Sequence, residues 1–362
     1  MAIEESFHNL RIAQVDRLAP DAIAVTLDVP EVLQPAFRFK PGQHMAVRAM
    51  IEGKEERRTY SIASGSDGVL RVGIREVPGG IFSTWAQSAL KPGVTLDVAG
   101  PVGRFVLPAG TGAARHILFV SAGAGITPVL GMIVDALERE PETSVTLLYG
   151  NRSTEAAMFL EEIEGLKDRF PARFDLLHIL SRGGDGDTPI LEGRLTGDKI
   201  KELAERRIDF ASLSLVYLCG PGSMIKDVRN ALEVLGVKRE AIKFEFFAAS
   251  AGAYHPVERV QARKAVATGD QITATAILDG VRTNFLLSRG QHVLEAVLKV
   301  GVKAPYSCTG GMCCTCRARV VEGTASMTVN YSLEPWEIDK GFVLTCQAVA
   351  TGDKLVIDYD AM

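Results

Sequence analysis

The fold is decided by the stretch KAPYSCTGGMCCTCRARV at residues 303–320. It places Cys308, Cys313 and Cys316 in the spacing C-x4-C-x2-C, and Cys346 follows after 29 intervening residues. This spacing is typical of a plant-type [2Fe–2S] cluster, in which two thiolates bind each iron. The sequence therefore predicts that these four cysteines hold such a cluster.

Two other interpretations of the cysteines remain open, a structural zinc site and reduced thiols without a metal. Zinc knuckles usually combine two short C-x2-C loops, and only one is present here. Gly310 and Gly311 favour the cluster, because they let the backbone wrap closely and direct its N–H groups at the sulfides. Cys346 is expected on an apolar strand at residues 342–350, and Cys314 is expected to be a small buried residue.

The composition of the chain is that of a globular protein with two or three domains. The chain has 362 residues, of which 47% are apolar and 23% are charged. Its net charge of −4 is too weak to suggest nucleic acid or an anionic membrane as a partner. The first residues lack a signal-peptide core, and no apolar run of about 18 residues occurs. Because an iron–sulfur loop needs free thiolates, a cytoplasmic location is expected.

The first region, residues 1–110, has the pattern of a small antiparallel β-barrel. Short β-branched runs alternate with turns such as Pro41-Gly42 and Pro92-Gly93, and one short helix is expected at residues 82–91. The expected strands are residues 10–18, 23–29, 44–51, 58–64, 69–77 and 94–100.

The second region, residues 111–248, alternates apolar strands with amphipathic helices, which predicts a doubly wound parallel sheet of the α/β class. Strands are expected at residues 116–122, 144–150, 173–180, 214–220 and 242–248. Helices are expected from Pro128 onward and at residues 155–170, 198–207 and 223–236. Residues 249–267 lack periodicity and are predicted to be a linker. A third domain, residues 268–362, is expected to contain a hairpin at 272–287, a helix at 292–301 and a last strand at 355–359.

Two glycine-rich turns suggest nucleotide binding. In the barrel, Arg58 and Tyr60 precede Gly79-Gly80, which lie at a helix start. A flavin needs a cation for its pyrophosphate, an aromatic face for its ring and bare backbone N–H groups at a helix start, and these residues can supply all three. In the second region, Gly123 and Gly125 lie between strand and helix, where a dinucleotide pyrophosphate would bind. The alternatives are a routine strand with a β-turn and a simple strand-to-helix turn.

The segment after the expected strand at 173–180 bears on the choice of dinucleotide. Ser181, Arg182 and Arg194 suit a 2′-phosphate and favour NADPH over NADH, with ordinary surface charge as the alternative. No acidic residue is expected where an NADH-binding site would hold the ribose hydroxyls. Cys219 follows the strand at 214–220 and is expected either to face the cleft or to be a buried, inert thiol.

These motifs together resemble the ferredoxin–NADP reductase superfamily with a C-terminal plant-type ferredoxin of the β-grasp fold. The domain order is similar to that of reductase components of bacterial oxygenases. Residues 6–30, the cluster loop and residues 181–195 resemble most the reductases of phenylacetyl-CoA epoxidases. Reductases of ketosteroid or ring-hydroxylating oxygenases are the alternative.

The resemblance implies a role for each matching residue. Ser61, Cys219, Glu245 and Phe247 would lie at the reacting rings, with Ser61 near flavin N5 and with Phe246 as the neighbouring alternative to Phe247. The flavin, FAD with FMN as the alternative, would be bound by Arg58, Thr59, Tyr60, Ser61, Gly79, Gly80, Ser83 and Thr84. NADPH would be bound by Gly123, Gly125, Thr127, Pro128, Ser181, Arg182 and Arg194, and iron by Cys308, Cys313, Cys316 and Cys346.

The resemblance also implies a path for electrons. NADPH would deliver two electrons as hydride, the flavin would hold one or two, and the cluster would pass single electrons to an oxygenase. A redox-sensing electron carrier without nicotinamide activity is the alternative from another class, and the intact glycines argue against it. Arg317 and Arg319 are interpreted either as a basic rim around the cluster or as a solvated strand face.

Overall fold

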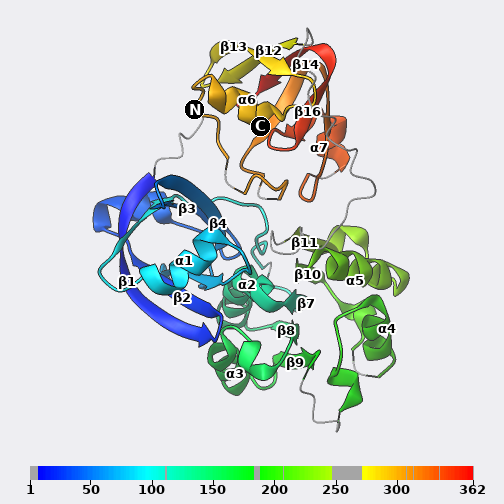
Figure 1. Cartoon of the computed structure of the whole chain (residues 1–362). Helices are drawn as coiled ribbons and strands as arrows, with labels where there is room; N and C mark the ends of the chain where they lie inside the picture. The colour runs from blue at the N-terminus through cyan, green and yellow to red at the C-terminus, as the bar shows by residue number, and fades with distance from the viewer. Residues whose placement is uncertain are drawn as a thin grey trace. The chain divides into compact units, whose positions relative to one another are not determined.

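The structure is a computed structural model that describes residues 7–110, 112–182, 188–206, 208–246, 271–306, 308–312, 314–333 and 335–361. The chain divides into two compact units, which are described separately (Figure 1). The first unit contains the barrel and the parallel sheet, and the second contains the cysteine loop. The predicted linker 249–267 lies outside the described residues. No helix among the described residues is long and apolar enough to cross a membrane.

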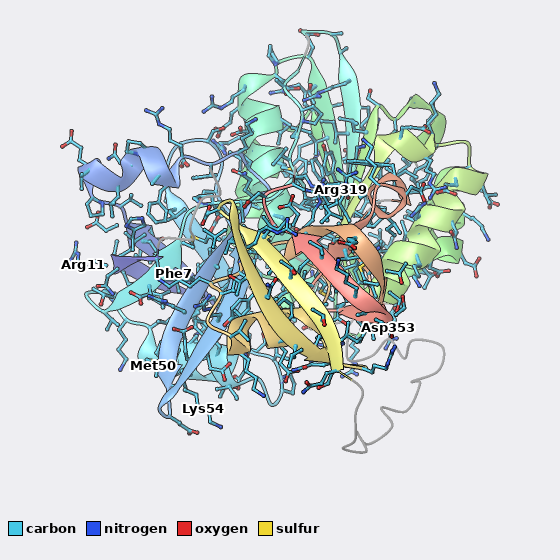
Figure 2. The ribbon with its side chains drawn as sticks, turned by 90° about the horizontal axis from the view of Figure 1, so that it is seen from above. Phe7, Arg11, Met50, Lys54, Arg319 and Asp353 are labelled. Carbon is cyan, nitrogen blue, oxygen red and sulfur yellow. The ribbon has the colours of Figure 1, made fainter. Side chains whose placement is uncertain are left out.

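The barrel is one antiparallel sheet in the order β4-β3-β6-β1-β2-β5. The predicted strands are present, although β4 begins at Lys54, before the predicted start at residue 58. β3 is mostly buried, whereas only Ser61 is buried in β4, and Figure 2 shows Met50 and Lys54 where β3 turns into β4. The short helix predicted at 82–91 is present as α1, whereas the turn η1 was not foreseen. The elements are β1 Phe7–Ala19, β2 Ala22–Asp28, η1 Glu31–Phe37, β3 His44–Ile51, β4 Lys54–Ser61, β5 Leu70–Arg75, α1 Ile81–Ala89 and β6 Thr95–Ala99.

The second sheet is parallel throughout, in the order β11-β10-β7-β8-β9. Its strand order reverses between β7 and β10, and in such sheets the ligand crevice lies outside the carboxyl ends at that point. The strands are β7 Arg115–Ala122, β8 Thr143–Asn151, β9 Phe174–Leu180, β10 Leu215–Gly220 and β11 Ile242–Phe246. The helices are α2 Ile126–Arg139, α3 Leu160–Arg169, α4 Gly197–Arg206 and α5 Gly222–Val234, with short turns η2 Gly123–Gly125, η3 Thr154–Ala156, η4 Pro189–Leu191, η5 Phe210–Ser212 and η6 Arg239–Ala241.

Two predicted helix starts differ from the structure. Helix α2 begins at Ile126, two residues before Pro128, because the turn Gly123–Gly125 leads directly into it. The helix predicted at 155–170 is interrupted, since Phe159 adopts a left-handed backbone with φ of 57° and α3 begins only at Leu160. Phe159 is fully buried, so tertiary packing overrides the local helical pattern.

The second unit is a mixed sheet in the order β13-β12-β16-β14-β15, consistent with the predicted β-grasp. The predicted hairpin is present, with Asp279 and Gly280 both at positive φ, as a two-residue turn of this kind requires. The backbone N–H groups of both turn residues donate to the carboxylate of Asp360 at 2.8 Å. The elements are β12 Gln271–Leu278, β13 Val281–Ser288, α6 Val293–Lys299, β14 Arg317–Met327, α7 Pro335–Asp339, β15 Phe342–Leu344 and β16 Ala348–Asp358.

The barrel and the parallel sheet contribute to a common apolar core, and each also has a separate core of its own. Tyr217 of β10 packs against Phe105 and Phe119, with ring centroids 5.3 Å apart in each case, and its hydroxyl donates to the carbonyl of Val106 at 3.0 Å. A Cβ added at Gly131 of α2 would overlap the carbonyl oxygen of Ser64 in the barrel. The two domains therefore contact each other through side chains and also directly between their backbones. These contacts fix the position of one domain relative to the other.

We expect Gly131→Ala to destabilise the holoprotein, because the added methyl meets backbone and forces the domains apart. Overpacking of this kind costs about 1–3 kcal/mol of unfolding free energy. Gly165→Ala in α3 is the matched control, since nothing lies within 4 Å of its Cβ position. It should stabilise by about 0.5–1 kcal/mol through helix propensity. Urea unfolding followed by flavin fluorescence measures both, and equal midpoints for the two variants would contradict the described packing.

Candidate functional site

The barrel side of the site is built on β4. Ser61 is buried at the end of this strand and pairs across the sheet with His44 of β3. The Tyr60 ring lies 5.8 Å from the ring of Phe82 in α1. Burial raises the pKa of Tyr60 well above its usual range, so its phenol stays protonated and offers a neutral aromatic face.

The predicted phosphate-binding turn precedes α1. Gly79 has a φ of 74°, and a Cβ at Gly80 would lie 2.6 Å from the Ser83 hydroxyl. That hydroxyl accepts the backbone N–H of Val77 at 3.0 Å, and the Thr84 hydroxyl donates to Glu76 at 3.0 Å. Both hydroxyls thus stabilise the turn itself, and the backbone at the start of α1 remains the predicted phosphate-binding element.

Arg58 and Thr59 lie on the same strand as Tyr60. The guanidinium of Arg58 is paired with Glu56 at 2.9 Å, and 41% of the side chain is exposed. The Glu56 side chain is 18% exposed, and Arg58 Nη1 also donates to the carbonyl of Arg57 at 2.6 Å. A bound phosphate would take the place of Glu56 as the anionic partner of the guanidinium. Thr59 pairs with Ala46 in the backbone ladder.

The second glycine turn connects β7 to α2. Gly123 has a φ of 55°, and a Cβ at Gly125 would overlap the carbonyl oxygen of Cys219. The Thr127 hydroxyl is buried and donates to the carbonyl of Ala124 at 3.0 Å, while Pro128 occupies the first turn of α2. Gly125 is therefore required by packing between β10 and α2 within the fold.

The structure brings a third arginine to the predicted 2′-phosphate segment. The backbone N–H of Arg182 donates to the carbonyl of Arg152 at 2.7 Å, so these residues lie side by side after β9 and β8. Arg182 and Arg194 are exposed, and Arg152 is paired with Asp21 at 3.1 Å. Sequence reasoning missed Arg152 because it follows a different strand.

An acidic residue also lies beside the segment after β9, which the sequence analysis did not expect. Glu192 forms a parallel bridge with Leu180 at the end of β9. It is therefore next to Ser181, where a ribose hydroxyl could be bound. The surroundings of this segment combine arginines with one carboxylate, and neither dinucleotide is excluded by charge alone.

The two halves of the site meet at a buried polar group. Cys219 at the end of β10 is fully buried and pairs with Glu245 of β11 and with Ser121 of β7. Burial raises the pKa of the Cys219 thiol, and the neighbouring Glu245 carboxylate raises it further. Of the two interpretations of Cys219, the buried thiol agrees with the structure.

His44 completes this group and was missed by sequence reasoning. Its Nδ1 lies 3.6 Å from Oε1 of Glu245, and its side chain is 5% exposed. The only signal in the sequence is its position opposite Ser61 in the predicted barrel. A single histidine in an apolar strand carries no functional pattern, so only the structure identifies it.

Phe246 belongs to the core of the parallel sheet. Its ring packs 5.4 Å from that of Phe244, and Gly222 faces it. Since side chains alternate along a strand, Phe246 and Glu245 point to opposite faces. Phe247 stays the predicted aromatic residue beside the flavin, and it lies outside the described residues.

The cysteine loop is organised by its backbone. The N–H of Gly310 donates to Sγ of Cys308 at 3.4 Å. A hydrogen bond from the side chain of Cys316 lowers the pKa of Cys346, and a backbone hydrogen bond from Gly311 adds to this effect. Cys316 and Cys346 are buried, whereas Cys313 lies outside the described residues.

Cys346 does not lie on a strand, contrary to the expectation for residues 342–350. β15 ends at Leu344 and β16 begins at Ala348, which leaves the cysteine in the intervening turn. Thr345 holds this turn, because its N–H and hydroxyl both donate to the carbonyl of Cys316, at 3.0 and 2.9 Å. The turn geometry thus brings the distant fourth cysteine to the loop.

The two arginines after Cys316 differ in their surroundings. Arg317 pairs at 3.0 Å with Glu337, whose side chain is fully buried, and its guanidinium lies 3.6 Å from the ring centroid of Phe342. Arg319 (Figure 2) is exposed and donates to the carbonyl of Lys340 at 3.1 Å. Arg317 therefore belongs to neither a basic rim nor a solvated face, and both side chains fasten β14 to the segment that precedes Cys346.

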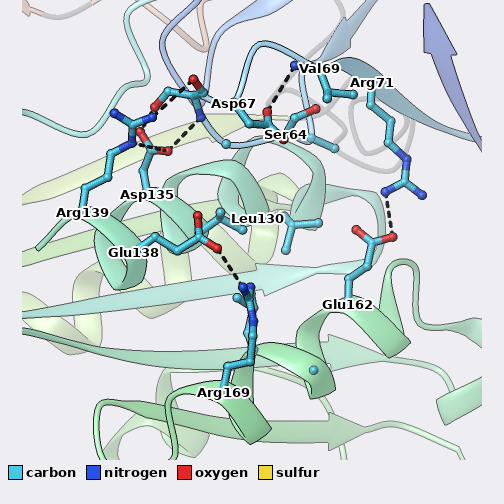
Figure 3. A pocket seen from close by; sticks show the side chains of 16 residues that line it. Ser64, Asp67, Val69, Arg71, Leu130, Asp135, Glu138, Arg139, Glu162 and Arg169 are labelled. Atoms are coloured by element: carbon cyan, nitrogen blue, oxygen red, sulfur yellow. Dashed lines mark hydrogen bonds and ion pairs between the residues drawn. The ribbon is translucent and has the colours of Figure 1, made fainter. Parts of the chain in front are cut away.

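A cavity of about 610 Å³ lies elsewhere in the first unit, between a barrel loop and helices α2 and α3 (Figure 3). Its arginines are paired with carboxylates, Arg71 with Glu162 at 2.7 Å, Arg139 with Asp135 at 3.5 Å and Arg169 with Glu138 at 2.9 Å. None of its described lining residues belongs to the predicted flavin or dinucleotide site. This cavity is therefore separate from the site.

The residues present fit the cofactors that the motifs predict. Among the described residues, buried His44 Nε2, Ser121 Oγ and Glu245 Oε2 have no hydrogen-bond partner within the protein, so they can serve polar ring atoms. The glycine turns before α1 and α2 have no side chains at the glycine positions, as a backbone that binds phosphate groups requires. Thiolates held by backbone N–H groups are the donors that an iron–sulfur cluster requires.

Comparison with protein families identifies three domains. Residues 9–107 match the oxidoreductase FAD-binding domain, residues 119–230 the oxidoreductase NAD-binding domain and residues 276–351 the 2Fe-2S iron-sulfur cluster binding domain. These define the class of the protein, an oxidoreductase that combines FAD, a nicotinamide dinucleotide and a [2Fe–2S] cluster.

Full-length relatives narrow this class. The chain is 37% identical to one of the subunits of the 1,2-phenylacetyl-CoA epoxidase of Escherichia coli (strain K12), over 98% of both chains. It is 29% identical to the ferredoxin reductase component of 3-ketosteroid-9-alpha-monooxygenase from Rhodococcus rhodochrous, over 97% of this chain and 96% of that one. The solved phthalate dioxygenase reductase shares the fold, with a TM-score of 0.56, 22% identity and 98% coverage of both chains. The chain therefore belongs to the ferredoxin–NADP reductase superfamily, in the group of oxygenase reductase components with a C-terminal [2Fe–2S] domain.

The buried thiol predicts a pH dependence of stability. Because the pKa of Cys219 is raised in the folded state, the unfolded chain loses this proton first, near the ordinary value of 9.0. Above that pH the unfolded state binds fewer protons, so the free energy of unfolding falls as the pH rises. We expect this fall to be steeper in the wild type than in Cys219→Ala, by up to about 1.4 kcal/mol per pH unit. Urea unfolding at several pH values with a reductant present measures it, and parallel curves would contradict the assignment.

Proposed function

We propose that this protein transfers electrons from NADPH through FAD and its [2Fe–2S] cluster to an oxygenase that converts phenylacetyl-CoA to its epoxide. The choice of this oxygenase as the partner rests on the 37% identity to the Escherichia coli epoxidase component over 98% of both chains. The meeting of the barrel strand and the nucleotide sheet at one buried polar group supports direct transfer between dinucleotide and flavin.

The proposed residue roles follow from the geometry of each half. Ser61 and Tyr60 would orient the flavin ring, and the backbone before α1 would bind its pyrophosphate. Gly123 and Gly125 would admit the dinucleotide to the carboxyl ends of β7 and β10. The shared core would hold the two rings together and exclude water. When bound, the flavin supplies the exchange between hydride and single electrons.

We further propose the domain limits 1–110, 111–248 and 268–362, and thiolate ligation by Cys308, Cys313, Cys316 and Cys346. The spacing of the cysteines supports the ligand set, and the backbone bonds to Cys308 and Cys346 agree with it. The core shared by the first two domains supports treating them as one functional module.

NADPH is the proposed donor because Arg182 and Arg194 are exposed after β9, and Arg152 lies beside Arg182. We expect Arg182→Ala to raise the KM for NADPH about tenfold or more, since a charge-assisted contact to phosphate contributes roughly 1.5–3 kcal/mol. The KM for NADH should change by less than about twofold. Arg11→Ala, which removes an exposed, paired arginine of the barrel, is the matched control. Parallel changes for both dinucleotides would remove the 2′-phosphate assignment.

The proposed function is tested by reconstitution with the purified epoxidase. With NADPH and phenylacetyl-CoA, the wild type should support epoxide formation measured by mass spectrometry. Cys346→Ser should abolish it while ferricyanide reduction continues, because ferricyanide accepts electrons from the flavin directly. Cys314→Ser is the matched control, since this cysteine lies outside the proposed ligand set.

Two outcomes would contradict the proposal. Equal loss of ferricyanide reduction and epoxidation in Cys346→Ser would disprove the order flavin before cluster. Support for a 3-ketosteroid hydroxylase without support for the epoxidase would favour the second candidate partner, to which the Rhodococcus relative points at 29% identity.

A further inference from the structure

One carboxylate of the barrel contacts two arginines from different places in the fold. Asp21 lies in the turn between β1 and β2, and its side chain is 31% exposed. Its Oδ1 lies 3.3 Å from Nε of Arg75, the last residue of β5. Its Oδ2 accepts a hydrogen bond at 3.1 Å from Nη2 of Arg152, the residue after β8. Asp21 therefore connects the barrel to the nucleotide sheet.

The backbone holds this carboxylate in place without help from Arg152. The carbonyl of Asp21 accepts the N–H of Glu76 at 2.7 Å, and the next residue, Ala22, pairs with Arg75 across β2 and β5. Arg75 is fixed as well, because its guanidinium donates to the carbonyl of Ala156 and only 17% of its side chain is exposed. Of the two ion pairs of Asp21, the one with Arg75 is therefore the better anchored.

The two arginines lie beside the two predicted phosphate positions. A Cβ added at Gly123, in the predicted pyrophosphate turn, would lie 3.2 Å from Nη1 of Arg75. The carbonyl of Arg152 accepts the N–H of Arg182, in the predicted 2′-phosphate segment, at 2.7 Å. Asp21 therefore supplies a negative charge to arginines at both places where a dinucleotide would bring its phosphates.

Arg152 is the arginine that can change its partner. Its side chain is 60% exposed, and ion pairs with such exposed members contribute little to stability. A guanidinium binds carboxylate and phosphate with the same planar set of donors, so the two anions compete for it. When Arg152 turns to a phosphate, the carboxylate of Asp21 keeps Arg75 as its partner and is not left as an unpaired charge. The exchange therefore has a small cost.

We propose that Asp21 occupies Arg152 when no dinucleotide is bound and competes with the 2′-phosphate of NADPH for this arginine. This inference rests on the proposed function, since it concerns the dinucleotide that the protein uses. Asp21 is then a specificity-determining residue of the barrel that acts through Arg152 and weakens the preference for NADPH. No covalent bond changes in the exchange, in which one anion replaces another at the guanidinium.

A purely structural ion pair between the two domains is the other interpretation of these contacts, and it makes a different prediction. Loss of a structural brace would loosen the fold, and the binding of every nucleotide would weaken or stay the same. Loss of a competitor would free Arg152, so that nucleotides with a 2′-phosphate bind more tightly and nucleotides without one do not.

The experiment compares the wild type with Asp21→Asn, Arg152→Gln, the double variant of these two and the control Asp28→Asn, all loaded with FAD. Asparagine keeps the size of the side chain and an oxygen that can accept from Arg75. Asp28 is another barrel carboxylate paired with an exposed arginine, Arg11, at 3.0 Å. Isothermal titration calorimetry with 2′,5′-ADP and with 5′-AMP measures dissociation constants without turnover, and only the first of these probes carries a 2′-phosphate.

The dissociation constant of 2′,5′-ADP should fall about two- to fivefold in Asp21→Asn, because an exposed ion pair no longer has to be broken. It should not change in Asp28→Asn, and the dissociation constant of 5′-AMP should be the same for all five proteins. Arg152→Gln should weaken the binding of 2′,5′-ADP. Adding Asp21→Asn to that variant should give no gain, because the arginine for which the carboxylate competes is absent.

Two outcomes would overturn the proposal. The first is that Asp21→Asn brings no gain in affinity for 2′,5′-ADP, whether its binding is equal, weaker or absent in both proteins. The second is an equal gain in the double variant, which would show a general effect of charge and no competition for Arg152. Asp21→Ser, which also lacks the carboxylate, takes the place of Asp21→Asn if that variant does not fold.

Failure of the proposed function is recognised separately. In that case the wild type itself would not pass electrons from NADPH to the epoxidase. The binding of 2′,5′-ADP requires neither electron transfer nor an oxygenase, so the effect of Asp21→Asn can be measured whatever the result of the reconstitution.

Discussion

The structure of the first unit depends on the close packing of the barrel against the parallel sheet. Gly131 lets α2 approach the backbone of Ser64, and Gly125 lets the β7–α2 turn approach the carbonyl of Cys219. Neither contact tolerates a side chain, because both partners are backbone. Ring-to-ring electron transfer requires fixed positions, and this packing holds the two domains in fixed positions.

A different interaction organises the second unit. The buried Glu337 carboxylate binds Arg317, whose guanidinium also packs on Phe342. A buried ion pair of this kind adds little net stability, and breaking it by removing one partner is costly. Its effect is to connect the residue after Cys316 with the helix and strand before Cys346, so that the loop and the distant fourth cysteine share one support.

Much of this organisation could be predicted from the sequence. The strand periodicity, the cysteine spacing and the two glycine turns identified the fold class and predicted a flavin, a nicotinamide dinucleotide and an iron–sulfur cluster, because each depends on local residue patterns. What could not be predicted depends on contacts between distant segments. His44 was missed because its place in the site is apparent only from its contact with Glu245, which lies in another domain. Arg152 was missed because it reaches the segment of Arg182 from a neighbouring strand. The role of Gly125 in packing was likewise invisible, since its partner Cys219 is far away in sequence.

The order of strands in the second unit bears on how the protein is made. β16, at residues Ala348–Asp358, is the middle strand of the sheet, yet it is the last of the five to leave the ribosome. Cys346 lies two residues before its first residue. During synthesis the first three cysteines of the proposed ligand set are therefore exposed before the sheet can close and before the proposed fourth ligand exists. Assembly of the cluster must follow translation of this segment, and the cell must protect three reactive thiols from oxidation until then.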